Sequence, residues 1–269
     1  MHVHSSFSDG TCSVEEIARQ AARRGVVMLA LTDHDSLDGQ RAFVSSCEKH
    51  SIRALSGVEL SSKWPFTVHI LGYRLLNPEP LEEALGWVVK RRNERNRLML
   101  ERLNWHGIKI TMKDIEEEAG GRVITRPHFA SALVKKGIVP DAGTAFSKYL
   151  ARGGAAYVPR DAYSPSDCIR IIRESGGLPA LAHPSLTGLD SRGLGDFLDE
   201  LKGYGLWGLE CVSSRCSAEE SLVFLEIAAV HSLFPTAGSD FHGSRRPGVA
   251  LGVQVTESFL PWARLGVAL

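Results

Sequence analysis

Cysteine is scarce in this sequence and follows no motif. The five cysteines contain no C-x-x-C pair and their number is odd, which argues against a thiolate zinc site, an iron–sulfur cluster or a disulfide framework. We therefore expect reduced thiols at all five positions, namely Cys12, Cys47, Cys168, Cys211 and Cys216.

Long apolar runs and an excess of one charge are also missing. No uninterrupted apolar run approaches the roughly 20 residues that a membrane span needs, and no basic stretch followed by an apolar segment opens the chain. Lys plus Arg and Asp plus Glu both total 31, so the basic excess of proteins held on long duplexes is absent. These absences predict a cytoplasmic protein that binds no membrane and no duplex DNA. The oligomeric state is not indicated.

Short apolar runs alternate with amphipathic segments over most of the 269 residues. Ser13 and Glu16 form a capping-box pattern that predicts a helix to about Arg24. Further helices are predicted over 38–50, 164–176 and 218–231, and strands over 26–31, 52–55, 57–59, 67–72, 178–181, 206–212 and 234–238. This alternation predicts an α/β fold with a parallel sheet, in which active-site residues follow the carboxyl ends of the strands.

The middle of the chain departs from this alternation. Residues 79–155 predict consecutive helices: one through Trp105, one after Thr111, one from Pro127 and one after Asp141. We interpret 79–155 as an inserted helical subdomain that caps the substrate, with 1–78 and 156–269 forming a barrel. The first predicted helix of this subdomain is basic. Its cationic side chains either bind phosphate or form a solvated face. They are Lys90, Arg91, Arg92, Arg95, Arg97 and Arg102.

A basic turn, Thr125-Arg126-Pro127-His128, begins one of these helices. A helix N-terminus presents free N–H groups and the positive end of the helix dipole, which favours phosphate. Arg126 and His128 are therefore our first candidates for contact with a substrate phosphate, and Arg160 and Arg245 are weaker ones. Alternatively, this turn is a solvated surface that contacts no phosphate.

Six histidines and three carboxylates stand where predicted strands end. Imidazole and carboxylate are ligands that suit Mn, Fe and Zn, and their number indicates a multinuclear metal site. A single His or Asp on a strand is more often structural, so the metal site is predicted from the occurrence of all nine residues together. The nine residues are His2, His4, Asp9, His34, Glu59, His69, His183, Asp240 and His242.

Several short motifs resemble, in order and over nearly the whole chain, the PHP (polymerase and histidinol phosphatase) family. They are His2-Val3-His4, Ser8-Asp9-Gly10, Thr32-Asp33-His34-Asp35, Gly57-Val58-Glu59, His69, Ala182-His183-Pro184 and Ser239-Asp240-Phe241-His242-Gly243. The resemblance implies a distorted (β/α)7 barrel with two or three divalent metal ions, Mn in first place and Fe or Zn as alternatives.

The resemblance also implies a role for each candidate ligand. One ion would be held by His2, His4, Glu59 and Asp240; Glu59 would bridge to a second, held by His69 and His183; Asp9, His34 and His242 would hold a third. Asp33 and Asp35 would orient ligands or relay a proton.

The activity implied by the family is hydrolysis of a phosphate ester. A hydroxide bridging the metals would attack the phosphorus, with Glu59, His183 and Asp240 acting through it. The stretch 91–97, the turn at 125–128 and Ala156-Tyr157-Val158-Pro159 are similar to the subgroup that removes the 3′-phosphate of nucleoside 3′,5′-bisphosphates, some members of which degrade short RNA from the 5′ end. A substrate with two phosphates needs a second basic site, which the insertion supplies.

Other functions remain open from the sequence. A mononucleotide or histidinol-phosphate phosphatase would use the same metals without a second basic cluster. A non-catalytic metal-stabilised module would have lost ligands, whereas all nine positions are filled. An amidohydrolase would carry a lysine on a barrel strand and no His242 beside its last Asp.

The start of the sequence departs from the family pattern. Family members usually carry a fuller first strand before the H-x-H motif, whereas here Met1 directly precedes His2. We therefore expect a clipped first strand and a free amine close to the first metal group, where its positive charge would weaken metal binding.

Overall fold

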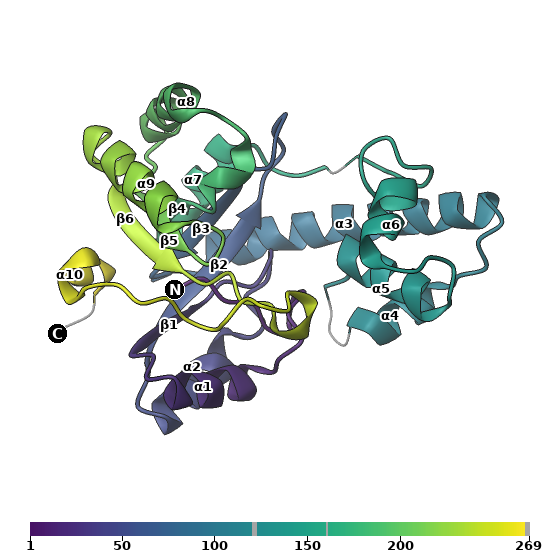
Figure 1. The fold of residues 1–269 in the computed structure, drawn as a ribbon, viewed down its shortest axis with the longest axis horizontal. Helices are drawn as coiled ribbons and strands as arrows, with labels where there is room; N and C mark the ends of the chain where they lie inside the picture. Colours follow the sequence, from purple (N-terminus) through teal and green to yellow (C-terminus); the bar gives the residue numbers. More distant parts are fainter. Residues whose placement is uncertain (120–122, 160, 267–269) are drawn as a thin grey trace.

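The computed structural model describes residues 1–119, 123–159 and 161–266. Its centre is one mixed sheet of six strands in the order β1-β2-β3-β4-β5-β6 (Figure 1). The strands are β1 (Met28–Leu31), β2 (Arg53–Ser61), β3 (His69–Tyr73), β4 (Leu178–Leu181), β5 (Gly208–Ser213) and β6 (Phe234–Gly238). None of the described helices is long and apolar enough to cross a membrane.

Helices cover the sheet and form the insertion. Those outside the insertion are α1 (Val14–Arg23), α2 (Gln40–Lys49), α7 (Pro165–Glu174), α8 (Ser191–Gly203), α9 (Ala218–Val230) and α10 (Trp262–Leu265), with short 3₁₀ turns η2 (Pro184–Thr187), η3 (Gly243–Arg245) and η4 (Glu257–Phe259). The predicted helix starts at Ser13 and Ser164 are confirmed, because each serine side chain accepts a hydrogen bond from the third helical residue.

The direction of β3 corrects the predicted all-parallel sheet. β3 runs antiparallel to both β2 and β4, whereas the pairs β1–β2, β4–β5 and β5–β6 are parallel. Only residues 62–68 connect β2 to β3, which is too short for the crossover that parallel neighbours require. His69 therefore begins its strand, and the antiparallel direction brings it to the sheet edge where β2 ends.

The N-terminal segment links the two edges of the curled sheet. Val3 forms single parallel bridges with Leu31, the last residue of β1, and with Phe241, just after β6. The His4 N–H donates to the Phe241 carbonyl at 2.9 Å, and the Thr32 N–H donates to the Val3 carbonyl at 2.9 Å. The expected first strand is thus reduced to isolated bridges, and the described residues form six strands rather than the seven of the expected barrel.

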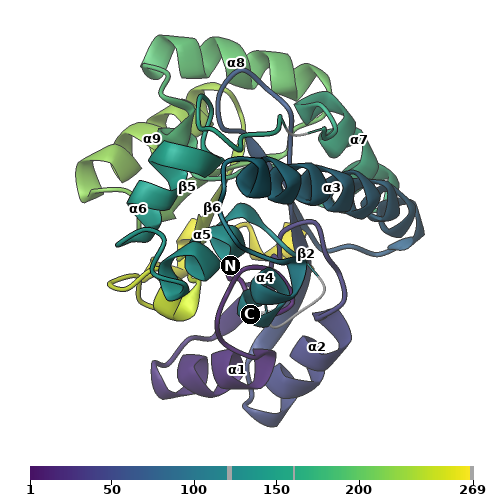
Figure 2. The ribbon, with the colours of Figure 1, turned by 90° about the vertical axis from the view of Figure 1, so that its right-hand side faces the viewer.

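The helical insertion lies between β3 and α7. It contains α3 (Glu79–Trp105), α4 (Met112–Ala119), α5 (Arg126–Lys135), α6 (Ala142–Ala145) and the π-helical turn η1 (Phe146–Leu150), as the sequence predicted. Figure 2 views the molecule from the insertion, whose helices lie in front of the sheet. Met99 and Leu103 of α3 pack with Ile115 and Phe129 in a separate apolar cluster, so the insertion has its own core.

Helix α3 belongs to two cores. Leu81 and Leu85, near its start, pack into the main core with Ile169 and Ile172 of α7, while its C-terminal half packs into the insertion core. One continuous helix of 27 residues therefore joins the insertion to the sheet.

Candidate metal centre

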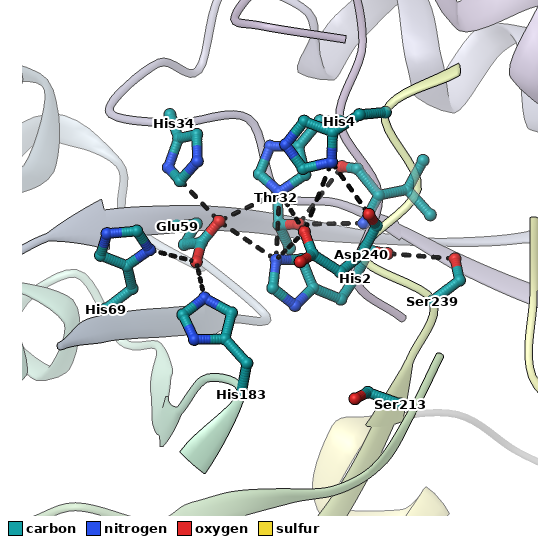
Figure 3. Close-up of polar contacts among 12 residues, drawn as sticks. His2, His4, Thr32, His34, Glu59, His69, His183, Ser213, Ser239 and Asp240 are labelled. Carbon is teal, nitrogen blue, oxygen red and sulfur yellow. Dashed lines mark hydrogen bonds and ion pairs between the residues drawn. The ribbon is translucent and has the colours of Figure 1, made fainter. Parts of the chain in front are cut away.

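Glu59, on β2, lies at the centre of the converging side chains (Figure 3). Its Oε1 is 2.8 Å from His69 Nδ1 and 2.9 Å from His183 Nε2. Its Oε2 is 3.0 Å from His4 Nε2, 3.1 Å from His2 Nε2 and 3.3 Å from His34 Nδ1. One carboxylate thus contacts five of the six predicted histidines.

A first group combines His2 and His4 with Glu59 and Asp240, and all four are buried. The Nε2 atoms of His2 and His4 are 3.0 Å apart, and Asp240 Oδ1 lies 3.5 Å from the former and 3.4 Å from the latter. Ligands about 2.1 Å from one ion lie about 3.0–3.4 Å from each other. The spacing of these four atoms therefore fits one shared cation.

Two further groups surround the first. His4, Asp9, His34 and His242 place one ligand atom each within 4.8 Å of one another, and so do His34, Glu59 and His69. His242 Nε2 is 3.3 Å from Asp9 Oδ1. His4 and His34 each belong to two groups, a sharing that the assignment from sequence did not include.

The ionisation of the site depends on burial and on the contacts between its carboxylates and histidines. Burial raises the pKa of Glu59, but His34, His2 and His69 lower it, and the result lies well below the ordinary value. Burial, with smaller effects of His4 and His69, lowers the pKa of His34 to about 3, against the opposing effects of Glu59 and Asp9. The carboxylate is therefore ionised and His34 is neutral near pH 7.

The buried donor set fits divalent ions. The Nδ1 atoms of His4 and His34 are buried and have no hydrogen-bond partner among the described residues, which is rare for buried polar atoms unless they face a ligand or water. The set is made of imidazole and carboxylate, without a thiolate, which suits Mn, Fe or Zn. Eight of the nine predicted residues belong to these groups and their chemistry fits divalent ions, whereas His183 belongs to none of the groups and instead contacts Glu59 Oε1.

Backbone strain occurs at two of these ligands and beside a third. Asp35, His183 and Asp240 have φ values of 48°, 29° and 52°, and they are three of the six non-glycine residues with positive φ among those described. Such conformations cost of order 1–3 kcal/mol each and persist where the surroundings impose them. The strain at His183 and Asp240 therefore marks the positions that direct a ligand into the site.

Similar proteins are known for most of the chain. The family model described as the PHP domain matches residues 1–123. The 3′,5′-nucleoside bisphosphate phosphatase of Chromobacterium violaceum is 33% identical over 94% of this chain and 90% of its own length. The chain belongs to the PHP domain family.

Further relatives extend the comparison of this PHP chain. The 5′-3′ exoribonuclease Rnm of Escherichia coli is 32% identical over 90% of the PHP chain and 84% of its own length. A solved Chromobacterium violaceum protein described as an amidohydrolase, with bound sulfate and no metal, has a TM-score of 0.88 at 32% identity and covers 98% of the PHP chain and 94% of itself. One from Bifidobacterium adolescentis, described as a metal-dependent phosphoesterase, has a TM-score of 0.85 at 31% identity, over 95% and 91%.

The candidate phosphate residues of the PHP chain occupy different environments. Arg126 lies at the start of α5, half-buried, with its Nη1 3.5 Å from the Leu150 carbonyl. Arg245 joins η3 to the insertion, donating to the Glu118 carbonyl at 2.9 Å and to Ser131 Oγ at 3.2 Å. Arg160 lies outside the described residues.

His128 is buried at the first turn of α5. Its Nδ1 accepts a hydrogen bond from the Thr125 N–H at 3.0 Å, while its Nε2 is buried without a hydrogen-bond partner among the described residues. Burial, and then the charge of Arg245, lower its pKa to about 4, although Asp9 opposes this. His128 is therefore a neutral ring near pH 7 whose Nε2 carries the proton.

Most of the basic run on α3 is paired with neighbouring groups. Arg91 bonds Asp161 and Glu94, and Arg97 pairs with Glu101 one turn away. Arg92 differs, because it is buried and its Nη2 donates to Asp35 Oδ2, while its Nη1 has no hydrogen-bond partner among the described residues. Arg92 thus reaches from α3 to Asp35, next to the candidate ligand His34.

The two aspartates beside His34 accept hydrogen bonds from different neighbours. Asp33 accepts hydrogen bonds from the Ser5 N–H at 2.8 Å and the Ser5 hydroxyl at 2.6 Å, and it also accepts from Ser8. These contacts fix the turn that leads to Asp9. Asp35 accepts from the Ser61 N–H at 3.0 Å and from Arg92.

Two arginines and one glutamate at the site were missed from the sequence. Arg215 donates to Asp240 Oδ2 at 2.7 Å, and Arg246 bonds the same oxygen, so the oxygen of Asp240 that faces away from the histidines is neutralised. Glu210 bonds His2 Nδ1 at 2.9 Å. Arg246 lies four residues after His242, a spacing that alone signals nothing, and Glu210 lies within the predicted strand 206–212, where a single carboxylate does not indicate a partner.

Proposed function

We propose that this PHP chain removes the 3′-phosphate from nucleoside 3′,5′-bisphosphates and also hydrolyses short 5′-phosphorylated RNA. The chain is a metal-dependent phosphoesterase, consistent with relatives named as a bisphosphate phosphatase, an exoribonuclease and a metal-dependent phosphoesterase. The observation that carries the proposal is the convergence of histidines on the buried carboxylate of Glu59.

The nine ligand residues would hold two or three divalent ions, with Mn preferred and Fe or Zn as alternatives. Such ions activate water, hold phosphate oxygens and offset charge on the departing oxygen. Glu59, with one oxygen toward His69 and His183 and the other toward His2, His4 and His34, would be shared between the ions. His183, which contacts Glu59 Oε1, and Asp240, which contacts His2 and His4, would help to hold the ions that activate water.

The second phosphate of the substrate would bind between the insertion and the barrel. Arg92 from α3 and His128 from α5 each carry a buried N–H group without a partner among the described residues. Arg126 and Arg245 add positive charge near the same helix start. Two N–H donors and nearby guanidinium groups suit a phosphate monoester dianion.

The proposed function gives different roles to two parts of the chain. We infer that 1–78 and 156–269 form the metal-binding barrel, with the segment around Val3 as its seventh strand, and that 79–155 caps the substrate. The separate apolar core of the insertion and the bridges of Val3 to both sheet edges support this division.

An amide substrate is less well supported, although one similar structure is described as an amidohydrolase. None of the six described strands contains a lysine, the residue that such an enzyme would carry on its barrel. Asp240 is followed at two residues by His242, which belongs to the Asp9 group.

The test is phosphate release by the Mn-loaded protein from adenosine 3′,5′-bisphosphate, AMP, histidinol phosphate and a 5′-phosphorylated short RNA. Preference for the bisphosphate or the RNA would support the proposal. Preference for AMP or histidinol phosphate would retain the metal site and reject the second phosphate site. No release from protein with verified metal would favour a non-catalytic module.

Replacing Arg126 by Ala is expected to lower kcat/KM for the bisphosphate by about tenfold or more, because hydrogen bonds to charged groups contribute about 1.5–3 kcal/mol. The bound metal should not change. Steady-state kinetics with the bisphosphate and AMP measure the effect, and Arg97→Ala, which removes an exposed cation paired with Glu101, is the matched control. Equal losses for both substrates would exclude Arg126 from the second phosphate site.

A further inference from the structure

Glu210, on β5, is fully buried beneath the candidate metal centre. One carboxylate oxygen, Oε1, lies 2.9 Å from His2 Nδ1, and the other, Oε2, accepts a hydrogen bond from the His183 backbone N–H at 2.8 Å. Glu210 therefore connects two residues that contact different oxygens of Glu59, and it belongs to none of the ligand groups.

The contact with His2 fixes the tautomer of that ring. A carboxylate can only accept hydrogen bonds, so Nδ1 of His2 must carry the proton. Without an ion, Nε2 also faces a carboxylate oxygen, Glu59 Oε2 at 3.1 Å, as well as His4 Nε2 at 3.0 Å. When the ring is neutral, the proton held on Nδ1 by Glu210 leaves the lone pair of Nε2 facing the site. A buried carboxylate on the far nitrogen is a usual way to orient a metal-ligating histidine.

The contact with His183 holds a strained residue. His183 has φ 29° and ψ 66°, a conformation unfavourable for a residue with a side chain. The hydrogen bond from its N–H to Glu210 helps to hold this conformation, which directs the ring so that Nε2 lies 2.9 Å from Glu59 Oε1.

Close packing leaves Glu210 little freedom. A Cβ at Gly238 of β6 would lie 2.3 Å from the Cβ of His2 and 2.9 Å from Glu210 Oε1. Glycine at this position therefore allows the His2 side chain and the Glu210 carboxylate to meet against the neighbouring strand.

We propose that Glu210 is a positioning residue for the metal centre, which fixes the Nδ1–H tautomer of His2 and the backbone of His183 at the same time. This inference rests on the metal-dependent function proposed above. It predicts that metal affinity depends more on the direction of the two hydrogen bonds than on the shape of the side chain.

The substitution Glu210→Gln reverses one of these hydrogen bonds without changing the shape. The His183 N–H requires the amide oxygen, so the amide NH₂ group must face His2 Nδ1. That nitrogen must then accept, which moves the proton to Nε2 and removes its lone pair from the site. We expect Mn affinity to fall by about 10–100-fold at one site, as for other residues that orient metal ligands.

Isothermal titration of the metal-free protein with Mn²⁺, together with the metal content after dialysis, measures this loss. Glu226→Gln on α9, which removes an exposed carboxylate, is the control and should bind as the wild type does. Unchanged Mn affinity in Glu210→Gln would overturn the inference. A wild-type protein that binds no divalent ion would instead reject the proposed function.

A second measurement does not depend on the folding of a variant. Histidine ¹⁵N NMR of the metal-free wild-type protein, with the His2 signal assigned by its absence in His2→Ala, reports which ring nitrogen carries a proton. A proton on Nδ1, bonded to Glu210, is expected, either alone or together with a proton on Nε2 that is bonded to Glu59. A ring protonated on Nε2 alone would overturn the inference.

Discussion

Replacing Glu59 by Gln is expected to lower kcat by about a thousandfold or more while leaving the fold intact. The carboxylate contacts five histidines through its two oxygens, and an amide would turn an NH₂ donor toward atoms that must bind a cation. A thousandfold loss in rate corresponds to about 4 kcal/mol of transition-state stabilisation, which is the scale expected when a carboxylate shared by the ligands of several ions loses its charge.

The measurement is steady-state phosphate release with Mn-loaded protein, together with circular dichroism and the number of ions bound. We expect an unchanged spectrum and at least one ion fewer per chain, since both Oε1 and Oε2 contact possible ligands of separate ions. Glu226→Gln should retain full activity. A Glu59→Gln variant with near-normal kcat would remove Glu59 from the site.

Removal of metal is expected to abolish activity and to lower Tm by about 5–10 °C relative to protein with Mn²⁺ at about 100 times its Kd. Binding at that concentration stabilises the folded state by about 2.7 kcal/mol, and 1 kcal/mol shifts Tm by about 2–4 °C in a domain of this size. The physical reason is that the ligands converge only in the folded chain, from β2, β3 and the segments after β4 and β6.

Differential scanning calorimetry with chelator, and then with Mn²⁺ restored, tests the second expectation. Both activity and Tm should return on addition of Mn²⁺. A Tm that is the same with and without the ion would show that the side chains converge without binding it, whereas a raised Tm without activity would separate binding from catalysis.

The candidate ligands could be predicted from sequence because each follows, or lies close to, the end of a strand. The edge of a sheet collects such positions, so their proximity could be anticipated. Their division into groups could not, because His4 and His34 each belong to two groups and His183 to none. The helices of the insertion were equally visible, since capping residues and helical periodicity are local signals.

The direction of β3 was not predictable in the same way. An apolar run indicates that a strand is buried and does not encode which way the strand runs. Direction here follows from the length of the connection from Ser61 to His69, read together with the position of both strands in the sheet. The closure of the sheet by Val3 similarly depends on pairing with residues far along the chain.

Partners of charged residues were also beyond the sequence. Arg91 and Arg92 are adjacent on α3, yet Arg91 pairs with Asp161 and Glu94 near the surface while Arg92 reaches Asp35 in the interior. Glu210 stands between apolar residues of a buried strand, and only the folded chain places it against His2.

The separate apolar core of the insertion has an evolutionary consequence. Every candidate metal ligand lies outside 79–155, and the cluster around Met99, Leu103 and Phe129 packs largely within that stretch. Substitutions within this core can therefore accumulate while the candidate ligands keep their positions, provided that the contacts of Arg92 with Asp35 and of Arg245 with Glu118 and Ser131 are retained. Those contacts are the places where variation in the insertion would reach the candidate site.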